Sequence, residues 1–98
     1  MTIDQALEMI RLEVSKETAK FPTWPTRVID AGNVVSEEAG ELAKACLQAT
    51  YEKHKSGEAE ITEEAVQTGA MAVRFIMSIG HYNFDVGPQH SQQEASHG

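Results

Sequence analysis

The segment ITEEAVQTGAMAVRFIMSI, residues 61–79, carries the strongest helical pattern in the chain. Small and apolar side chains recur in it at steps of four and three residues, the spacing of one face of an α-helix, at Ile61, Ala65, Thr68, Ala72, Phe75 and Ile79. A second stripe follows a different face of the same helix, through Val66, Ala70, Val73 and Met77. We therefore predict a helix over residues 58–79 that is apolar on two sides and that ends at Gly80.

Two earlier segments carry the same helical period. The segment 2–20 has one apolar face, formed by Ile3, Leu7, Ile10 and Val14. Thr2 or Asp4 is expected to cap this helix, and the prolines that follow it end it. The segment 26–55 predicts one long helix, whose apolar stripe comprises Val28, Val35, Ala39, Leu42 and Cys46. We expect Cys46 to be buried in this stripe as a small apolar side chain.

Fold class and domain organisation follow from these segments. No stretch alternates apolar and polar residues for long, so strands are not expected. The sequence predicts an all-α bundle of three to four helices in one domain, residues 1–84, followed by a flexible polar tail, residues 85–98. Three helices cannot easily cover both apolar sides of the helix over 58–79. We therefore expect dimerisation to complete the bundle.

Charge and cysteine content exclude several classes of function. Acidic residues number 15 against 8 basic ones, which gives a net charge of −7. Such a chain repels nucleic-acid backbones and anionic membranes, so no nucleic-acid or membrane partner is expected. A single cysteine excludes an internal disulfide and a multi-cysteine zinc site. No apolar run is long enough for a membrane span and no signal peptide is recognisable, so we expect a cytoplasmic protein.

More than half of the acidic residues lie in the second and third predicted helices. Helical geometry puts Glu38 and Glu41 on one face beside the apolar stripe, while Glu37 points to the solvated side. Glu64 and Gln67 have the same three-residue spacing on the next helix. If the two helices pack antiparallel, these side chains converge on one hard divalent cation. The alternative is that both acidic faces are simply solvated.

The stretch VVSEEAGELAKA, residues 34–45, resembles the Glu-Glu-x-x-Glu signature of MazG-like proteins, which belong to the all-α nucleoside triphosphate pyrophosphohydrolase superfamily. The second signature of that family, Glu-x-x-Asp, follows after a variable gap on the next long helix. The stretch EEAVQTGAMAVRF, residues 63–75, is similar to that helix, with Glu64 in the glutamate position and Gln67 in the aspartate position. The resemblance covers residues 24–79.

The resemblance implies an enzyme that hydrolyses a nucleoside triphosphate between its α- and β-phosphates, giving the monophosphate and pyrophosphate. It assigns magnesium, with manganese as an alternative, to Glu38, Glu41, Glu64 and Gln67. Glu37 then orients the attacking water or supports the ligands, so the catalytic residues are Glu37, Glu38 and Glu41. The expected substrate is a deoxynucleoside or non-canonical nucleoside triphosphate, removed in a housecleaning role. Members of the family form dimers or dimers of dimers, so a homodimer or a dimer of dimers is expected.

Gln67 departs from the family pattern, because an amide brings no charge to a metal. The register of the second signature stays open as a result, since Glu60 and Glu63 have the same spacing and carry two charges. The function stays open too. The alternatives are a catalytically weak helical module that binds nucleotide, metal or protein without useful turnover, and a purely structural helical dimer.

Two residues outside the acidic signatures are candidates for substrate contact. Trp24 either stacks on the nucleobase or plugs the end of the bundle. Arg74 either meets a phosphate or pairs with Glu63 or Glu60. The remaining basic residues of this region are interpreted as surface charges, namely Lys44, Lys53 and Lys55.

Overall fold

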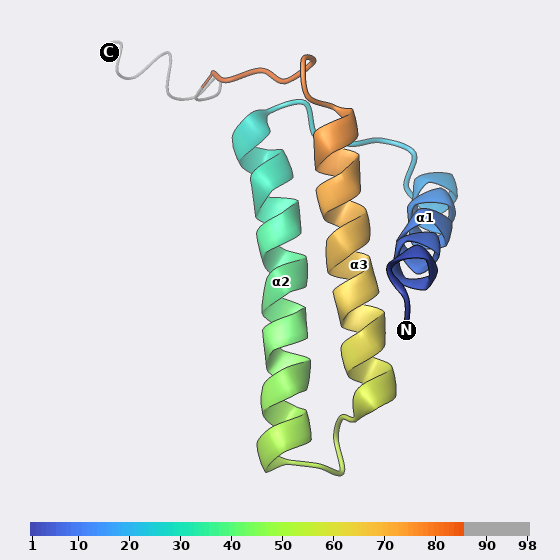
Figure 1. Ribbon diagram of the computed structural model, residues 1–98. Helices are drawn as coiled ribbons and strands as arrows, with labels where there is room; N and C mark the ends of the chain where they lie inside the picture. The colour runs from blue at the N-terminus through green and yellow to red at the C-terminus, as the bar shows by residue number, and fades with distance from the viewer. Residues whose placement is uncertain (86–98) are drawn as a thin grey trace, which may run out of the picture.

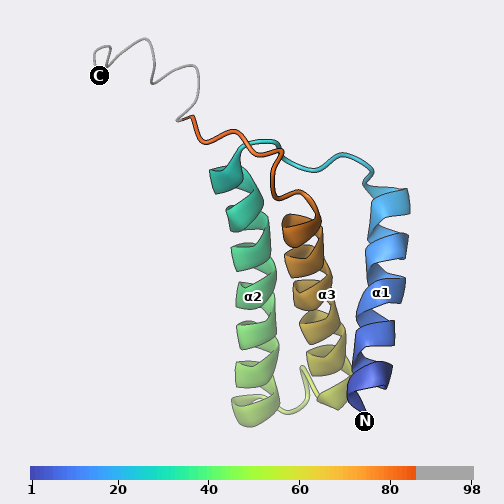
Figure 2. The same ribbon diagram turned by 45° about the horizontal axis from the view of Figure 1, so that its top comes forward.

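The fold is an all-α bundle, as the sequence predicts. A computed structural model describes residues 1–85, which form the helices α1 (Ile3–Lys20), α2 (Val28–Tyr51) and α3 (Glu58–Met77). α3 lies between α1 and α2, and α2 and α3 run antiparallel (Figures 1 and 2). α3 packs against both neighbours, whereas α1 and α2 make no contact within the described part of the chain. The predicted tail lies outside the described residues, apart from Asp85.

The start of α1 follows one of the two predicted caps. The Thr2 hydroxyl accepts a hydrogen bond from the Gln5 backbone N–H at 3.1 Å. The Gln5 side chain in turn accepts one from the Thr2 backbone N–H at 2.8 Å. This reciprocal pair is a capping box, and it satisfies two backbone groups that a helix start leaves without helical partners.

α2 is shorter than predicted at both ends. It covers Val28–Tyr51, whereas the sequence predicted residues 26–55. Its first residue is tied to the segment after α3, because the Val28 N–H donates to the Asn83 carbonyl at 2.9 Å. At the other end the chain leaves the helix and forms a turn, closed by the Lys55 N–H donating to the Glu52 carbonyl at 2.8 Å.

The face that α2 turns toward α3 also differs from the predicted one. The buried residues of α2 are Ala31 and Ala45, which lie on the same sector as Glu38. The predicted apolar stripe runs beside this sector: Val28, Val35 and Leu42 are half-buried, and Ala39 and Cys46 are exposed. The prediction that Cys46 is buried is therefore wrong. Small alanines let the two helices approach along the line from Ala31 to Ala45, and this rotation brings Glu38 into the contact.

α3 contributes half of the small core, and α2 contributes the other two of its four apolar residues. The buried residues of α3 are Ala70, Met71 and Arg74. On the side of α1 the packing is tight, since a Cβ added at Gly69 would lie 2.8 Å from Cδ1 of Ile10. Within residues 1–85 no large side chain is fully buried, and Ile76 keeps 64% of its surface exposed. None of the three described helices is apolar enough over a sufficient length to cross a bilayer.

Candidate functional site

α2 and α3 bring the two acidic signatures together. Glu41 and Glu64 line one polar cavity from opposite helices. Glu38 lies one helical turn before Glu41, is half-buried, and is close enough to Glu64 for their charges to interact. Gln67 is half-buried one turn along α3 from Glu64. Glu37 is exposed, as predicted for the solvated side of α2.

The environment of Glu38 is unfavourable for a negative charge. Burial raises the pKa of this carboxyl above its ordinary value, and the negative charges of Glu64, Glu17 and Glu41 raise the pKa further, in that order. A carboxylate in such a place is stabilised by a proton or by a cation. At neutral pH a bound cation stabilises the site more than a proton does, because it neutralises several of these charges at once.

α1 adds two acidic residues that the sequence analysis did not single out. Burial, a side-chain hydrogen bond to Glu17 and the charges of Glu17 and Glu63 raise the pKa of Glu13, and nearby Lys16 offsets part of this effect. One carboxylate oxygen of Glu13 is buried without a hydrogen-bond partner among residues 1–85. Acidic side chains from all three helices therefore face the same region. Helical spacing gave a signal for this, since it places Glu13 and Glu17 beside the apolar face of α1.

A polar cavity of about 180 Å³ lies at the end of the α2–α3 pair, next to the turn that joins the helices. α2 contributes Glu41, Lys44, Ala45 and Gln48, the turn contributes Lys55 and Ser56, and α3 contributes Glu60 and Glu64. Two of the three lysines interpreted as surface charges thus line a cavity. Ser56, in the turn, is 7% exposed.

The two residue pairs considered for the second signature lie in different surroundings. The Glu60 carboxylate accepts a hydrogen bond from the Gly57 backbone N–H at 2.8 Å, so it caps the start of α3. Glu63 is exposed, and its charge acts on Glu13 of α1 rather than on the acidic residues of α2. Glu64 is half-buried and interacts with Glu38. Glu64 is therefore the acidic residue of α3 that interacts with Glu38, while the role of Gln67, half-buried one turn away, stays a prediction.

The donor set fits a hard divalent cation in its chemistry. Among the described residues, no three His, Cys, Asp or Glu side chains are arranged closely enough to hold a metal as they stand. The candidate residues nevertheless offer only oxygen atoms, from the carboxylates of Glu38, Glu41 and Glu64 and the amide of Gln67. Magnesium prefers such ligands and keeps several waters, so it does not need a complete protein cage. Burial and the neighbouring carboxylates raise the pKa of Glu38, and a bound cation would favour its charged form.

Trp24 closes the end of the bundle opposite the α2–α3 turn. Its indole N–H donates to the Tyr82 hydroxyl at 2.8 Å, and that hydroxyl donates to the Phe75 carbonyl at 2.9 Å. The rings of Phe75 and Tyr82 are also in contact, with centroids 4.9 Å apart. These contacts match the structural role expected for Trp24, while its contact with a nucleobase stays a prediction.

Arg74 occupies the same end of the bundle and does not meet the acidic residues expected as its partners. It is buried, donates to the Phe21 carbonyl at 2.9 Å and stacks over the Trp24 ring at 4.8 Å from the centroid. The expected pairing with Glu63 or Glu60 is wrong, because the Arg74 side chain turns toward the connection between α1 and α2. Arg74 and Trp24 line a cavity of about 140 Å³, and contact of Arg74 with a phosphate stays a prediction.

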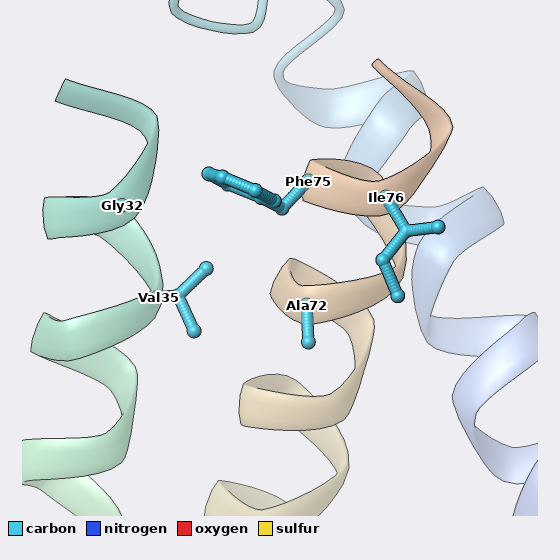
Figure 3. A pocket seen from close by; sticks show the side chains of 5 residues that line it. All are labelled: Gly32, Val35, Ala72, Phe75 and Ile76. Carbon is cyan, nitrogen blue, oxygen red and sulfur yellow. The ribbon is translucent and has the colours of Figure 1, made fainter. Parts of the chain in front are cut away.

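An apolar groove of about 320 Å³ opens between α2 and α3, near the start of α2. It is lined by Gly32, Val35, Ala72, Phe75 and Ile76, and the side chains of Val35 and Phe75 extend into the space between the helices (Figure 3). A Cβ added at Gly32 would meet no atom within 4 Å, so the groove is open beside this residue. The groove is apolar and contains none of the acidic residues.

Comparisons of the chain with models of known protein families, with curated proteins and with solved structures found no match. The resemblance to MazG-like proteins therefore rests on the two sequence signatures.

Proposed function

We propose that the chain is a magnesium-dependent nucleoside triphosphate pyrophosphohydrolase. The observation that carries the proposal is the convergence of the two signatures: Glu41 and Glu64 share one cavity, and Glu38 faces Glu64. Spacing alone is compatible with two unrelated solvated faces. Carboxylates held together across two helices, at the expense of charge repulsion, point instead to a bound cation.

In this proposal Glu38, Glu41, Glu64 and Gln67 hold magnesium, or manganese in its place. The bound ion supplies neutralisation of the phosphate charge and a lowered pKa of the attacking water. Glu37 is exposed beside these residues and orients the water by accepting a hydrogen bond. A nearby carboxylate takes one proton from the water, and the water oxygen attacks the α-phosphorus. The bond from that phosphorus to the bridging oxygen breaks, and pyrophosphate leaves with the bridging oxygen. The substrate is a deoxynucleoside or non-canonical nucleoside triphosphate, and the setting is a cytoplasmic housecleaning role.

The second candidate is a catalytically weak module that binds nucleotide, metal or protein. Gln67 favours it, because an amide leaves the metal with one negative charge fewer than the family pattern supplies. The two candidates differ in turnover and not in fold.

The proposal includes a homodimer, or a dimer of dimers. Two features support it: the buried core is small, and apolar side chains such as Phe75 and Ile76 form an open groove between α2 and α3 (Figure 3). A second copy of this chain covers such a groove with its own apolar helix faces, which makes the contact symmetric.

The test of the activity is product identification with a variant and a matched control. Purified chain is incubated with deoxynucleoside triphosphates and magnesium, and the products are separated by ion exchange. We expect monophosphate and pyrophosphate from the parent and from Glu8→Gln, a change on the exposed face of α1. We expect neither product from Glu41→Gln, with an unchanged circular dichroism spectrum. Equal turnover in Glu41→Gln and the parent contradicts the assignment.

A further inference from the structure

Arg74 is a buried cation without a carboxylate partner. The residue is 8% exposed, and it forms no ion pair with another residue of the described chain, 1–85. Its guanidinium stacks over the Trp24 ring, and its Nη2 donates to the Phe21 carbonyl at 2.9 Å. Removing an ion from water is costly, so a buried charge usually has a full counter-charge. A carbonyl and an aromatic ring offset only part of that cost.

Most of the hydrogen-bonding capacity of Arg74 is unused. A guanidinium carries five N–H donors, and the Phe21 carbonyl occupies one of them. The N–H groups on Nε and Nη1 have no hydrogen-bond partner among residues 1–85. Neither nitrogen is sealed inside the protein, since the enclosed side-chain atoms without a partner in the described chain belong to other residues. The planar fork of donors on a guanidinium matches the oxygen atoms of a carboxylate or a phosphate.

Arg74 lines a cavity of about 140 Å³ at the end of the bundle opposite the α2–α3 turn, together with Thr18, Trp24, Met77 and Ser78. The hydroxyls of Thr18 and Ser78 form no hydrogen bond with residues 1–85, so both can donate to a ligand. No acidic side chain of the described residues lines the cavity, and the guanidinium is its charged group. A cavity of this volume holds more than a single water. The lining therefore suits a small anion that accepts several hydrogen bonds.

The acidic residues of the proposed metal site do not neutralise Arg74. Their cavity, beside the α2–α3 turn, shares no residue with the Arg74 cavity. The charges that act on Glu38 are all negative, so Arg74 is not among them. The positive charge that acts on Glu13 is that of Lys16. The charge of Arg74 therefore remains for a ligand.

We infer that this cavity binds a phosphate group without a metal, through the Arg74 guanidinium and the hydroxyls of Thr18 and Ser78. The ligand is inorganic phosphate or a phosphomonoester, since both present the same tetrahedral oxyanion. α1 supplies Thr18 and the end of α3 supplies Arg74 and Ser78, so a bound phosphate joins the ends of these two helices. The Trp24 indole is held by the Tyr82 hydroxyl at 2.8 Å, which fixes the ring against the guanidinium before the ligand arrives. This site goes beyond the proposed function and does not depend on it.

The test is binding of inorganic phosphate to the full chain in EDTA at pH 7, with chloride at matched ionic strength as the reference. Isothermal titration calorimetry measures the affinity. We expect Arg74→Gln to weaken binding about tenfold or more, because it removes charge-assisted hydrogen bonds, and Thr18→Ala to weaken it about three- to tenfold. Arg11→Gln is the matched control, because Arg11 is exposed on α1 and does not line the cavity. Its affinity should stay within about twofold of the parent.

Thermal unfolding of the same proteins separates binding from folding. Phosphate should raise the unfolding temperature of the parent and of Arg11→Gln, since a ligand of the folded state stabilises by mass action, and should leave Arg74→Gln unchanged. Thr18 is exposed and Ser78 is half-buried, so the double variant Thr18→Ala/Ser78→Ala keeps the fold and carries the test if Arg74→Gln does not fold. O-phosphoserine is the second probe. Tighter binding than inorganic phosphate identifies a monoester as the ligand and weaker binding identifies the free ion, and both results support the site.

Glu41→Gln distinguishes this site from the proposed metal site. Phosphate affinity in EDTA should be the same in Glu41→Gln and the parent, even if neither protein hydrolyses a nucleotide. Phosphate binding that requires magnesium and is lost in Glu41→Gln places the anion at the metal site and overturns the inference. No binding by the parent in EDTA overturns it too, as does unchanged affinity in both Arg74→Gln and Thr18→Ala/Ser78→Ala.

Discussion

Replacing Glu38 by Gln should make the metal-free protein more stable. Glu38 is half-buried and faces three other carboxylates, and burial followed by the charges of Glu64, Glu17 and Glu41 raises its pKa. At neutral pH the folded protein therefore holds a negative charge in an unfavourable place. Gln keeps the size of the side chain and removes the charge, so the repulsion disappears while the packing stays.

The expected gain in the free energy of unfolding follows from the like-charge pairs that Glu38→Gln removes. A like-charge pair one helical turn apart costs about 0.2–0.5 kcal/mol, which applies to Glu38 and Glu41. The contacts across helices to Glu64 and Glu17 are partly exposed and screened, so each adds a similar small amount. The three pairs together cost about 0.6–1.5 kcal/mol. In a domain of this size that corresponds to a rise of about 2–12 °C in the unfolding temperature.

The stabilisation by Glu38→Gln should depend on pH. A group whose pKa is raised by folding binds its proton more tightly in the folded state, so folded stability falls as pH rises through that raised pKa. Below the ordinary value of 4.5 the carboxyl is neutral in both states, and Glu38→Gln should have no advantage. At pH 7 the advantage should be complete. The pKa of Glu13 is also raised, so Glu13 contributes to the pH dependence of the parent's stability. The effect of Glu38 is therefore read from the difference in unfolding temperature between Glu38→Gln and the parent at each pH.

The assay is thermal unfolding followed by circular dichroism, in EDTA and then in excess magnesium. Glu37→Gln is the matched control, because Glu37 is exposed on the same helix and its charge is the smallest of the four that raise the pKa of Glu38. In EDTA at pH 7 Glu38→Gln should unfold at a higher temperature than the parent and than Glu37→Gln. Magnesium should stabilise the parent and leave Glu38→Gln almost unchanged, since a ligand of the folded state raises stability by mass action. A lower unfolding temperature for Glu38→Gln than for the parent in EDTA means that the charge of Glu38 does not destabilise the metal-free fold.

Three further predictions concern the metal, the helix packing and the assembly. Gln67→Asp should tighten magnesium binding in a calorimetric titration, because it adds a negative charge; weaker binding argues for the rival register. Gly69→Ala should destabilise the fold by about 1 kcal/mol, because the new Cβ would lie 2.8 Å from Cδ1 of Ile10 and overpacking costs more than the gain in helix propensity. Gly40→Ala is the control, because a Cβ there meets nothing within 4 Å, and it should stabilise the fold by about 0.5–1 kcal/mol. Denaturant titrations of both variants and the parent measure these differences. Ala72→Glu should convert the proposed dimer to monomer in sedimentation velocity, since Ala72 lines the apolar groove; a variant that still sediments as a dimer places the interface elsewhere.

The helices could be predicted from the sequence because their signals are local. Apolar spacing, the Thr2 cap and the prolines after α1 act within a few residues of each other, and α1 begins and ends where expected. The face of α2 that meets α3 could not be predicted in this way. The apolar stripe that includes Cys46 is more hydrophobic than the sector of Ala31, but the small alanines allow a closer approach of the two helices.

The site was predictable to the extent that it depends on helical spacing. Helical spacing places Glu38 and Glu41 on one face of α2 and Glu64 on one face of α3. The short turn between the two helices makes them antiparallel, which brings these faces together. Ser56 and the partners of Arg74 depend on the path of the connecting segments, which no periodic pattern encodes.

Pyrophosphate release distinguishes the proposed pyrophosphohydrolase from a module that binds without turnover. The chain is incubated with a panel of canonical and modified nucleoside and deoxynucleoside triphosphates, with magnesium and with EDTA. We expect equimolar pyrophosphate and nucleoside monophosphate, formed only with the metal and lost in Glu38→Gln. Release of single phosphate, or no release from any substrate by a folded sample, contradicts the proposed activity.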